Sequence, residues 1–228
     1  MHPLALDLFC GVGGASMGLH LAGFDVIGID IAPQPRYPFR FIRGDALAPP
    51  VDLTRFDLIW ASPQCERFTR VWRGQEHRRD DYPDQIEPIR QLLLASGVAF
   101  VIENVPEAPV RADVVLTGAQ FGLPIVRRRH FECERFTPPF ALNAEHWPER
   151  TTRNGGLAMI AGRGGAMKGW NRRNWEKPEI RAKLAKRNSV AGWREAMQMP
   201  WADRDGIRKA VPPAYAEHIG RAFLEFVR

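Results

Sequence analysis

Short apolar runs alternate with polar, glycine-marked turns through the first half of the chain. Runs typical of buried strands lie at 4–9, 26–29, 39–42, 58–61 and 100–102. Helical spacing of apolar residues occurs at 15–22 and 88–95, and a glycine follows each segment as a stop signal. Strands that alternate with helices predict an α/β fold, with a mostly parallel twisted sheet and helices on both of its faces.

The pattern changes after about residue 136. Prolines interrupt the chain, and the next stretch is rich in glycine and basic residues. Helical spacing returns at 178–186, 190–199 and 213–227. We therefore expect one α/β domain formed by 1–136 and 188–228, and a small irregular lobe at 137–187 that handles the substrate.

Composition narrows the class of protein. The chain has 228 residues, 45% of them hydrophobic, and no apolar run approaches the roughly 20 residues that cross a bilayer. Its N-terminus lacks the features of a signal peptide. The three cysteines, Cys10, Cys65 and Cys133, are widely spaced. This spacing predicts a reducing compartment such as the cytoplasm, without disulfides, zinc or another metal.

The positive charge of the chain indicates which kind of partner it binds. The formal net charge is +6, a moderate excess of the kind found in proteins that meet polyanions. Basic residues gather at 127–129 and along 163–187, where Trp170 and Trp175 are interleaved with them. The second cluster favours nucleic-acid contact slightly over a solvated helix face.

A glycine turn, Gly11-Val12-Gly13-Gly14, follows the first strand. Glycines at this place let the backbone approach a ligand, and the next helix begins there. Asp30 ends the second strand, where an acid can bind ribose hydroxyls. Ser16 replaces the last glycine of G-x-G-x-x-G, so a plain strand–turn–helix is the alternative.

Cys65 stands in a proline-bounded turn just after the strand at 58–61. Ligands of open α/β folds bind at such strand ends. A thiol whose pKa is lowered by positive charge there would be a nucleophile, and a small buried apolar residue is the alternative. Cys10 and Cys133 are weaker candidates.

Glu103 follows the strand at 100–102, so partial desolvation would raise the pKa of its carboxyl and let it donate a proton. The alternative is an ordinary helix-capping carboxylate. Arg127 and Arg129 would share one face if they lay on a strand. They would then hold an anion or orient the acid, unless they belong to a solvated edge.

Taken in order, five segments resemble the DNA (cytosine-5) methyltransferases. They are 7–14 (Asp-Leu-Phe-Cys-Gly-Val-Gly-Gly), Pro63-Gln64-Cys65, Glu103-Asn104-Val105, Arg127-x-Arg129 and Ala210-Val211-Pro212-Pro213. The short chain looks most like the small solitary enzymes of bacteriophages, which would place it in the cytoplasm of a bacterial host. The resemblance implies a Rossmann-like fold of the S-adenosyl-L-methionine-dependent methyltransferases.

The resemblance also implies roles for particular residues. Cys65 would add to carbon 6 of cytosine and activate carbon 5 for methylation, Glu103 would hold the base, and Arg127 and Arg129 would stabilise its charge. In duplex DNA the base must first leave the stack. The residues implied for binding S-adenosyl-L-methionine are Phe9, Gly11, Gly13, Gly14, Asp30, Ile31, Asp45, Ala46, Pro63, Lys209 and Val211.

The chain departs from the family pattern at Gln64, Glu66, Ile125 and Lys209. A carboxylate at Glu66 should disfavour the neighbouring thiolate unless it points away. Lys209 either suits a carboxylated cofactor or faces solvent.

The largest departure is that only 137–187 is available to read DNA. The expected substrate is therefore DNA with short or relaxed sequence recognition. The alternatives are a free cytosine nucleotide such as deoxycytidine monophosphate, RNA cytosine, or a catalytically inactive nucleic-acid-binding relative.

Overall fold

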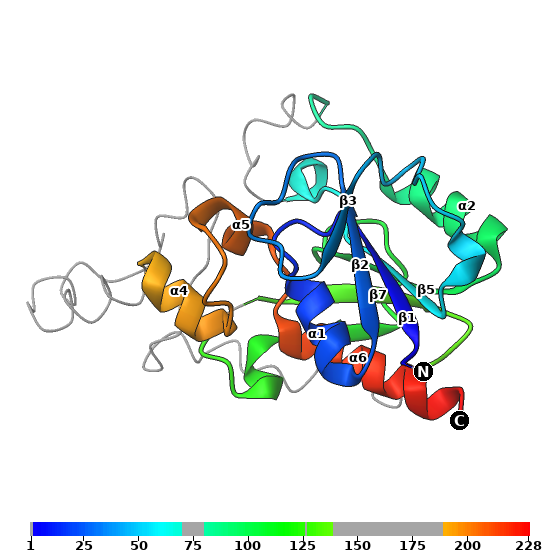
Figure 1. Cartoon of the computed structure of the whole chain (residues 1–228). Coiled ribbons are helices and arrows are strands. Elements are labelled where there is room, and N and C mark those ends of the chain that lie inside the picture. Colours follow the sequence, from blue (N-terminus) through cyan, green and yellow to red (C-terminus); the bar gives the residue numbers. More distant parts are fainter. Residues whose placement is uncertain (1, 70–79, 126, 139–188) are drawn as a thin grey trace, which may run out of the picture.

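The computed structural model describes residues 2–69, 80–125, 127–138 and 189–228 (Figure 1). Its centre is a seven-stranded sheet of order β3-β2-β1-β4-β5-β7-β6. The strands are β1 (Leu4–Leu8), β2 (Asp25–Asp30), β3 (Arg40–Arg43), β4 (Leu58–Ala61), β5 (Ala99–Asn104), β6 (Val114–Leu116) and β7 (Arg129–Glu134). Strands β1 to β5 pair in parallel, whereas β7 runs antiparallel to both β5 and β6. The predicted mostly parallel sheet is confirmed.

Helices cover both faces of the sheet. They are α1 (Gly14–Ala22), α2 (Ile86–Ser96), α4 (Val190–Met197), α5 (Arg204–Lys209) and α6 (Pro213–Phe226), with short 3-10 turns η1 (Leu53–Arg55), η2 (Glu66–Phe68) and η5 (Gly118–Phe121). Because successive strand residues point to opposite faces, Ala5 and Trp60 pack in one core with α1 and α6, and Leu6 and Ile59 pack in the other with α2.

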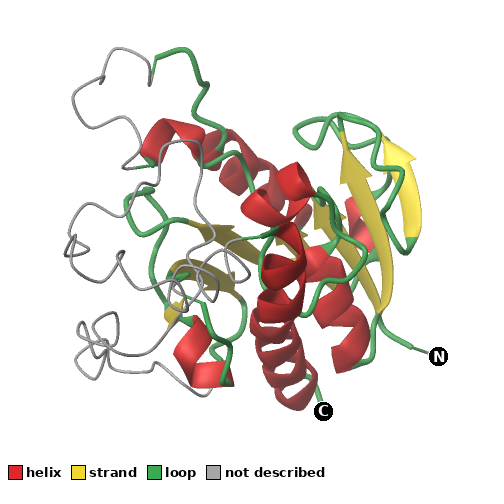
Figure 2. Ribbon diagram, turned by 90° about the vertical axis from the view of Figure 1, so that its left-hand side faces the viewer, coloured by secondary structure: helices red, strands yellow, loops and turns green. Residues whose placement is uncertain are grey.

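Helix α6 brings the C-terminal part of the chain back beside α1 (Figure 2). The two helices approach closely because α1 carries glycines at the contact. A Cβ atom on Gly18 would lie 2.1 Å from the backbone oxygen of Pro213, and one on Gly14 would lie 2.2 Å from that of Val211. The contact fixes the segment 210–213 against the glycine turn.

The apolar pattern located the central elements within a few residues, but the structure adds elements that it did not predict. Strands β6 and β7 and helix α5 were not expected. The condition for a shared strand face of Arg127 and Arg129 is not met, because β7 begins only at Arg129. The helix expected at 178–186, and all but the first two residues of the predicted lobe, lie outside the described residues.

Candidate functional site

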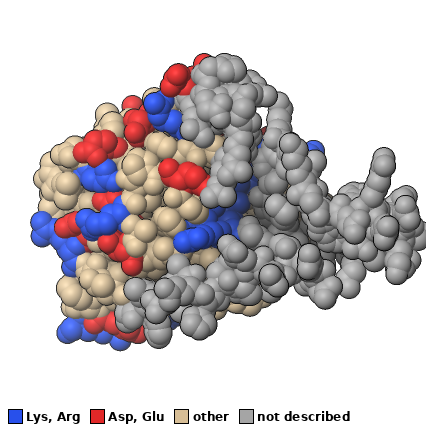
Figure 3. Space-filling view, turned by 180° about the vertical axis from the view of Figure 1, so that it is seen from behind, with Lys and Arg blue, Asp and Glu red and all other residues tan. Residues whose placement is uncertain are grey.

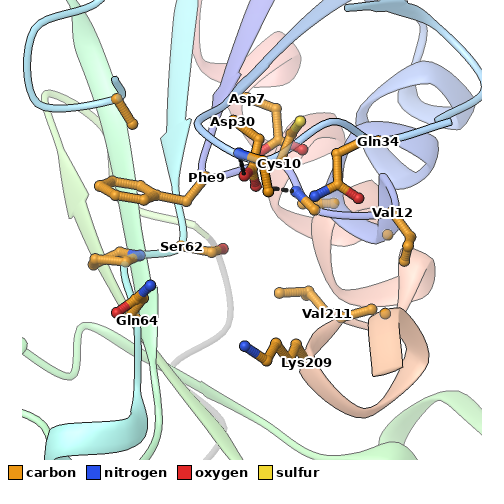
Figure 4. A pocket seen from close by; sticks show the side chains of 18 of the residues that line it. Asp7, Phe9, Cys10, Val12, Asp30, Gln34, Ser62, Gln64, Lys209 and Val211 are labelled. Atoms are coloured by element: carbon orange, nitrogen blue, oxygen red, sulfur yellow. Dashed lines mark hydrogen bonds between the residues drawn. The ribbon is translucent and has the colours of Figure 1, made fainter. Parts of the chain in front are cut away.

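A cavity of about 400 Å³ opens at the carboxyl ends of the parallel strands (Figure 4). Segments far apart in sequence form it: the glycine turn after β1, the turn after β4, and the segment at the end of α5. The predicted site residues that line it are Phe9, Gly11, Gly14, Asp30, Ile31, Asp45, Ala46, Pro63, Cys65, Glu103, Arg129, Lys209 and Val211. Gly13 and Arg127 are not among its lining residues.

The glycine turn is held in a left-handed backbone conformation. Phe9, Gly11 and Gly13 have φ angles of 60°, 50° and 83°, a region that favours glycine. Gly13 is needed for the turn and for packing, since a Cβ atom there would lie 2.9 Å from the ring of Tyr37. Gly13 therefore has a structural role in the turn, and its predicted place beside the cofactor stays a prediction.

Backbone amides fix the Asp30 carboxylate at the end of β2. Gly11 N–H donates to Oδ2 at 3.0 Å, and Ala32 N–H donates to Oδ1 at 2.9 Å (Figure 4). In the same way, Asp45 Oδ1 accepts the N–H of Leu47 at 2.9 Å. Each carboxylate oxygen can still accept a further hydrogen bond, so both acids remain able to receive hydroxyl or amine groups of a ligand.

Asp7 lines the cavity, although no role was predicted for it. It is 1% exposed, accepts a hydrogen bond from the Ser16 hydroxyl, and has a second oxygen, Oδ1, without a partner within the described residues. Burial raises the pKa of its carboxyl to about 7, against the hydrogen bond from Ser16. The only sequence signal was its position in the segment 7–14.

Hydrogen bonds hold the turn that carries Cys65. Asn104 Nδ2 donates to the carbonyl oxygen of Pro63 at 3.0 Å, and Gln64 N–H donates to Gln85 Oε1 at 3.1 Å. Cys65 is half-buried and lies just before η2. The Asn104 contact, which the sequence did not foresee, ties the turn after β4 to the end of β5.

The electrostatic surroundings of Cys65 are mixed. Burial raises the pKa of its thiol, Arg129 opposes this rise, and Glu66 and Glu103 add to it. Arg127 also favours the thiolate from a greater depth. Burial raises the pKa of the Cys10 and Cys133 thiols far more, and the largest charge effect on each comes from a carboxylate, Asp7 and Asp113 respectively. Cys65 is therefore the cysteine best placed to react.

Glu103 and Arg129 form a buried ion pair beside the thiol. Arg129 Nε lies 2.8 Å from Glu103 Oε1, and the two side chains are 13% and 7% exposed. The pair bridges the neighbouring strands β5 and β7. Burial raises the pKa of the Glu103 carboxyl despite Arg129, Arg127 and a hydrogen bond from Ser62. The site thus contains an acid that holds its proton more tightly than an exposed glutamate does.

Arg127 lies behind this pair. Its Nη2 donates to the carbonyl oxygen of Arg208 at 2.9 Å, and its own carbonyl oxygen accepts from the Tyr215 hydroxyl at 2.7 Å. Burial and the adjacent Arg129 lower the pKa of its guanidinium to about 9. Arg127 therefore joins the start of β7 to α5 and α6 and acts on the site through its charge.

Lys209 is mostly exposed to solvent, and its amine also has a partner at the cavity. Its Nζ lies 2.9 Å from Glu66 Oε1, so two of the four unusual residues noted in the sequence meet at the cavity. Within the described residues, no cluster of three or more His, Cys, Asp or Glu side chains could hold a metal ion. Nor is any helix of that part long and apolar enough to span a membrane.

The fold of the chain matches a solved structure over its whole length. The methyltransferase Dnmt2 of S. pombe superimposes with a TM-score of 0.59, at 15% sequence identity, over 100% of both chains. The chain has a methyltransferase fold. This confirms the predicted fold class.

Other likenesses cover only part of the chain. Among curated proteins, the Type II methyltransferase M1.HphI of Haemophilus parahaemolyticus is 26% identical over 161 residues, which are 54% of this chain and 43% of that protein. The chain thus matches less than half of that relative. A structure described as a DNA modification methyltransferase encoded within an E. coli prophage covers 57% of this chain at 21% identity, with a TM-score of 0.40. No family model matches.

Proposed function

We propose that this chain transfers a methyl group from S-adenosyl-L-methionine to carbon 5 of cytosine in DNA. The observation that carries the proposal is the shared cavity. It places the Cys65 thiol and the Glu103–Arg129 pair in one space with the glycine turn and Asp30. A nucleophile and a proton-holding acid on one side, and a nucleoside-binding wall on the other, are what this reaction requires.

The cavity residues fit the cofactor. Asp30 and Asp45 would receive its ribose hydroxyls and adenine amine, Phe9 and Ile31 would pack on adenine, and the glycine turn would border its methionine part. The free oxygen of Asp7 adds a buried acceptor at the wall of the cavity, which suits a cationic ligand. When bound, the cofactor supplies an electrophilic methyl group.

Cys65 would act as the nucleophile toward the base. Carbon 5 of cytosine is too weak a nucleophile by itself, whereas addition of the thiolate to carbon 6 makes carbon 5 enamine-like. After carbon 5 has gained the methyl group, its proton leaves to a base and the carbon–sulfur bond breaks. The thiolate is thereby released and the double bond of the ring is restored.

Glu103 would control the proton at N3 of the base. As the thiolate adds to carbon 6, negative charge develops on the ring. A carboxyl with a raised pKa can hold a proton at N3 and accept a hydrogen bond from the exocyclic amine. Arg129 lies 2.8 Å from that carboxyl and would keep it oriented. The site would therefore favour the adduct over the free base.

DNA is the substrate favoured by the five ordered segments that resemble the DNA (cytosine-5) methyltransferases. The described surface in Figure 3 mixes Lys and Arg with Asp and Glu, and the basic cluster at 163–187 lies outside the described residues. RNA cytosine and free deoxycytidine monophosphate are the alternative substrates. Duplex binding would weaken steeply with salt through counterion release, whereas single-nucleotide binding would change little.

One experiment tests both reaction and substrate. The full chain is incubated with labelled S-adenosyl-L-methionine and, separately, with duplex DNA, single-stranded DNA, RNA and deoxycytidine monophosphate, and the product is identified by mass. We expect 5-methylcytosine in DNA with the parent chain, and no label with Cys65→Ser. The matched control Cys133→Ser, which changes a buried thiol outside the cavity, should methylate as the parent does.

A fluorinated substrate tests the covalent step. Fluorine at carbon 5 cannot leave as a proton does, so DNA carrying 5-fluorocytosine should stay bonded to Cys65 after methyl transfer. An adduct on the Cys65 peptide supports the mechanism. Transfer of labelled methyl to the fluorinated DNA without such an adduct contradicts the mechanism, and so does methylation by Cys65→Ser. If no substrate is methylated, the alternative of a catalytically inactive relative is favoured.

A further inference from the structure

Tyr37 lies in the loop between β2 and β3, and its hydroxyl reaches into the strand–turn–helix unit at the start of the chain. Its Oη lies 2.7 Å from Ser16 Oγ on α1. Ser16 in turn donates its hydroxyl proton to the Asp7 carboxylate on β1. Because a hydroxyl has one proton to donate, the Tyr37 hydroxyl must donate to Ser16. The hydrogen bonds therefore run in one direction, from Tyr37 through Ser16 to Asp7.

Two glycines make room for the Tyr37 phenol. A Cβ atom on Gly28, in β2, would lie 2.2 Å from Tyr37 Oη, and one on Gly13 would lie 2.9 Å from the Tyr37 ring. The ring also packs against Phe39 and Phe41, with centroid distances of 5.9 and 5.8 Å. Burial raises the pKa of the phenol above its usual range, so the hydroxyl keeps its proton and remains a donor.

The loop that carries Tyr37 also forms part of the cavity wall. Ile31, Ala32 and Gln34 line the cavity, and Figure 4 shows Gln34 on the same side of it as Asp30. The N–H of Tyr37 donates to the carbonyl oxygen of Gln34 at 3.0 Å. The position of the phenol is therefore passed directly to a residue of the cavity.

Other side chains that hold this loop act at exposed positions. Arg43 Nε donates to the carbonyl oxygen of Ile31 at 3.2 Å, and Arg36 Nη1 donates to that of Trp201 at 3.4 Å. Water competes for such exposed hydrogen bonds, which lowers their net contribution. The hydrogen bond of the Tyr37 hydroxyl is partly buried instead, so it should hold the loop more firmly.

We propose that Tyr37 is a positioning residue for the cofactor: its hydroxyl fastens the loop 31–39 to Ser16, and through Ser16 to Asp7, and thereby keeps Gln34 in the cavity wall. This inference rests on the proposed function, because it requires the cofactor to occupy the side of the cavity formed by the glycine turn. It also gives Ser16 a role of its own. A glycine at that position, as in G-x-G-x-x-G, could not connect the loop to Asp7.

Cofactor affinity of the full chain, measured by calorimetry with S-adenosyl-L-methionine, tests the inference. Tyr37→Phe keeps the ring and removes the hydroxyl, so we expect the affinity to fall about three- to tenfold. In methylation assays the same variant should raise KM for the cofactor, while kcat at saturating cofactor stays near that of the parent. A purely structural loss would not divide KM from kcat in this way.

Tyr215→Phe is the matched control for the loss of a tyrosine hydroxyl. It removes a hydrogen bond of the same length, 2.7 Å, from the Tyr215 hydroxyl to the carbonyl oxygen of Arg127, and Tyr215 does not line the cavity. This variant should lower the midpoint of urea unfolding and leave cofactor affinity near that of the parent.

Two further variants test the path through Ser16. Ser16→Ala removes both the acceptor for Tyr37 and the donor to Asp7, so it should weaken cofactor binding at least as much as Tyr37→Phe does. The double variant should bind no more weakly than Ser16→Ala, because both changes break one chain of hydrogen bonds. Gly28→Ala keeps the Tyr37 hydroxyl but fills its place, and should also weaken binding.

Three outcomes would overturn the inference: parental affinity in Tyr37→Phe, losses that add up in the double variant, or an equal loss of affinity in Tyr215→Phe. If the parent binds the cofactor but methylates no cytosine substrate, the proposed reaction fails, while the affinities still decide the role of Tyr37. If the parent binds no cofactor, both the proposed function and this inference fail.

Discussion

The two walls of the cavity are built in different ways. The wall that would hold the cofactor consists of the glycine turn, Asp30 and Asp45, whose positions are set by backbone angles and backbone amides. The wall that would hold the base consists of charged side chains from separate strands and helices, joined as the pairs Glu103–Arg129 and Glu66–Lys209. Backbone geometry thus supplies shape on one side, and ion pairs supply proton control on the other.

The largest expected effect comes from breaking the base wall at Glu103. Glu103→Gln keeps the size of the side chain but cannot carry a transferable proton, so methyl transfer should fall by about 10²- to 10³-fold. Cofactor affinity, measured by calorimetry, should stay within about twofold of the parent.

Glu132→Gln is the matched control for that variant. Glu132 is also buried on a sheet strand and also bonds an arginine, Arg90, at 2.8 Å, but it does not line the cavity. Its replacement should lower stability and leave the turnover of the folded protein near that of the parent. Equal losses of turnover in both variants would mean that Glu103 is only structural.

The wall that would hold the cofactor can be disturbed by a steric clash at the glycine turn. Gly14→Ala would place a Cβ atom 2.2 Å from the backbone oxygen of Val211, so α1 and the segment 210–213 must separate. This separation should lower the free energy of unfolding by about 1–3 kcal/mol or more. We expect weaker binding of the cofactor, measured by calorimetry, and a lower urea concentration at the midpoint of unfolding.

The control for Gly14→Ala is Leu21→Ala on the same helix, where the side chain is 50% exposed. This variant should change the midpoint and the affinity little. Retention of parental affinity by Gly14→Ala would contradict the close-packed contact described between α1 and the 210–213 segment.

The cofactor wall should also give stability a pH dependence. In the folded state burial raises the Asp7 pKa from 3.8 to about 7, so the folded chain binds this proton more tightly than the unfolded chain does. The contribution of Asp7 is therefore most favourable below about pH 4 and is lost as pH rises toward 7. Relative to the parent, Asp7→Asn should gain free energy of unfolding, on the order of 1 kcal/mol or more, across this range.

Urea unfolding at several pH values measures this trend. Asp52→Asn is the opposite control, because hydrogen bonds from Thr54 lower the pKa of the exposed Asp52 carboxyl. The stabilisation by the ionised Asp52 is present at neutral pH and is lost in acid. Asp52→Asn should therefore become less stable relative to the parent as pH rises. A flat difference between Asp7→Asn and the parent would show that Asp7 is ionised in the folded chain.

The smallest effect on methyl transfer is expected from the hydrogen bonds that hold the turn carrying Cys65. Asn104→Ala removes the donor to the Pro63 carbonyl, which should lower methyl transfer about tenfold by loosening the turn. Gln85→Ala removes the acceptor for the Gln64 N–H, a hydrogen bond at an exposed position, and should cost less. The reverse order of the two rates would place the main support of the turn on the Gln85 side.

The sequence located the parts of the fold whose apolar pattern is strong. Strand β1 is nearly all apolar and helix α1 ends at a glycine, so both were predicted close to their observed bounds. Strand β7 was not predicted because only Phe131 and Cys133 of its six residues are apolar. The partner of its buried Glu132 is Arg90, which comes from α2. Helix α5 was missed because it has only six residues and buries only Ile207.

The site was predicted unevenly for a related reason. Residues within contiguous segments, such as Cys65 and Glu103, could be placed at strand ends by pattern alone. The pairing of Glu66 with Lys209 joins residues distant in sequence, and no local pattern encodes it. The same holds for Arg127, whose partner is the carbonyl of Arg208.

The contact of Gly14 with the segment at Val211 has a consequence for biosynthesis. The glycine turn is made about 200 residues before the segment that closes its cavity and the helix that packs beside it. A nascent chain that stops before residue 204 lacks the Lys209 and Val211 side of the cavity. Because domains consolidate only when their distant contacts are available, cofactor capture should begin only after α5, the segment 210–213 and α6 have left the ribosome.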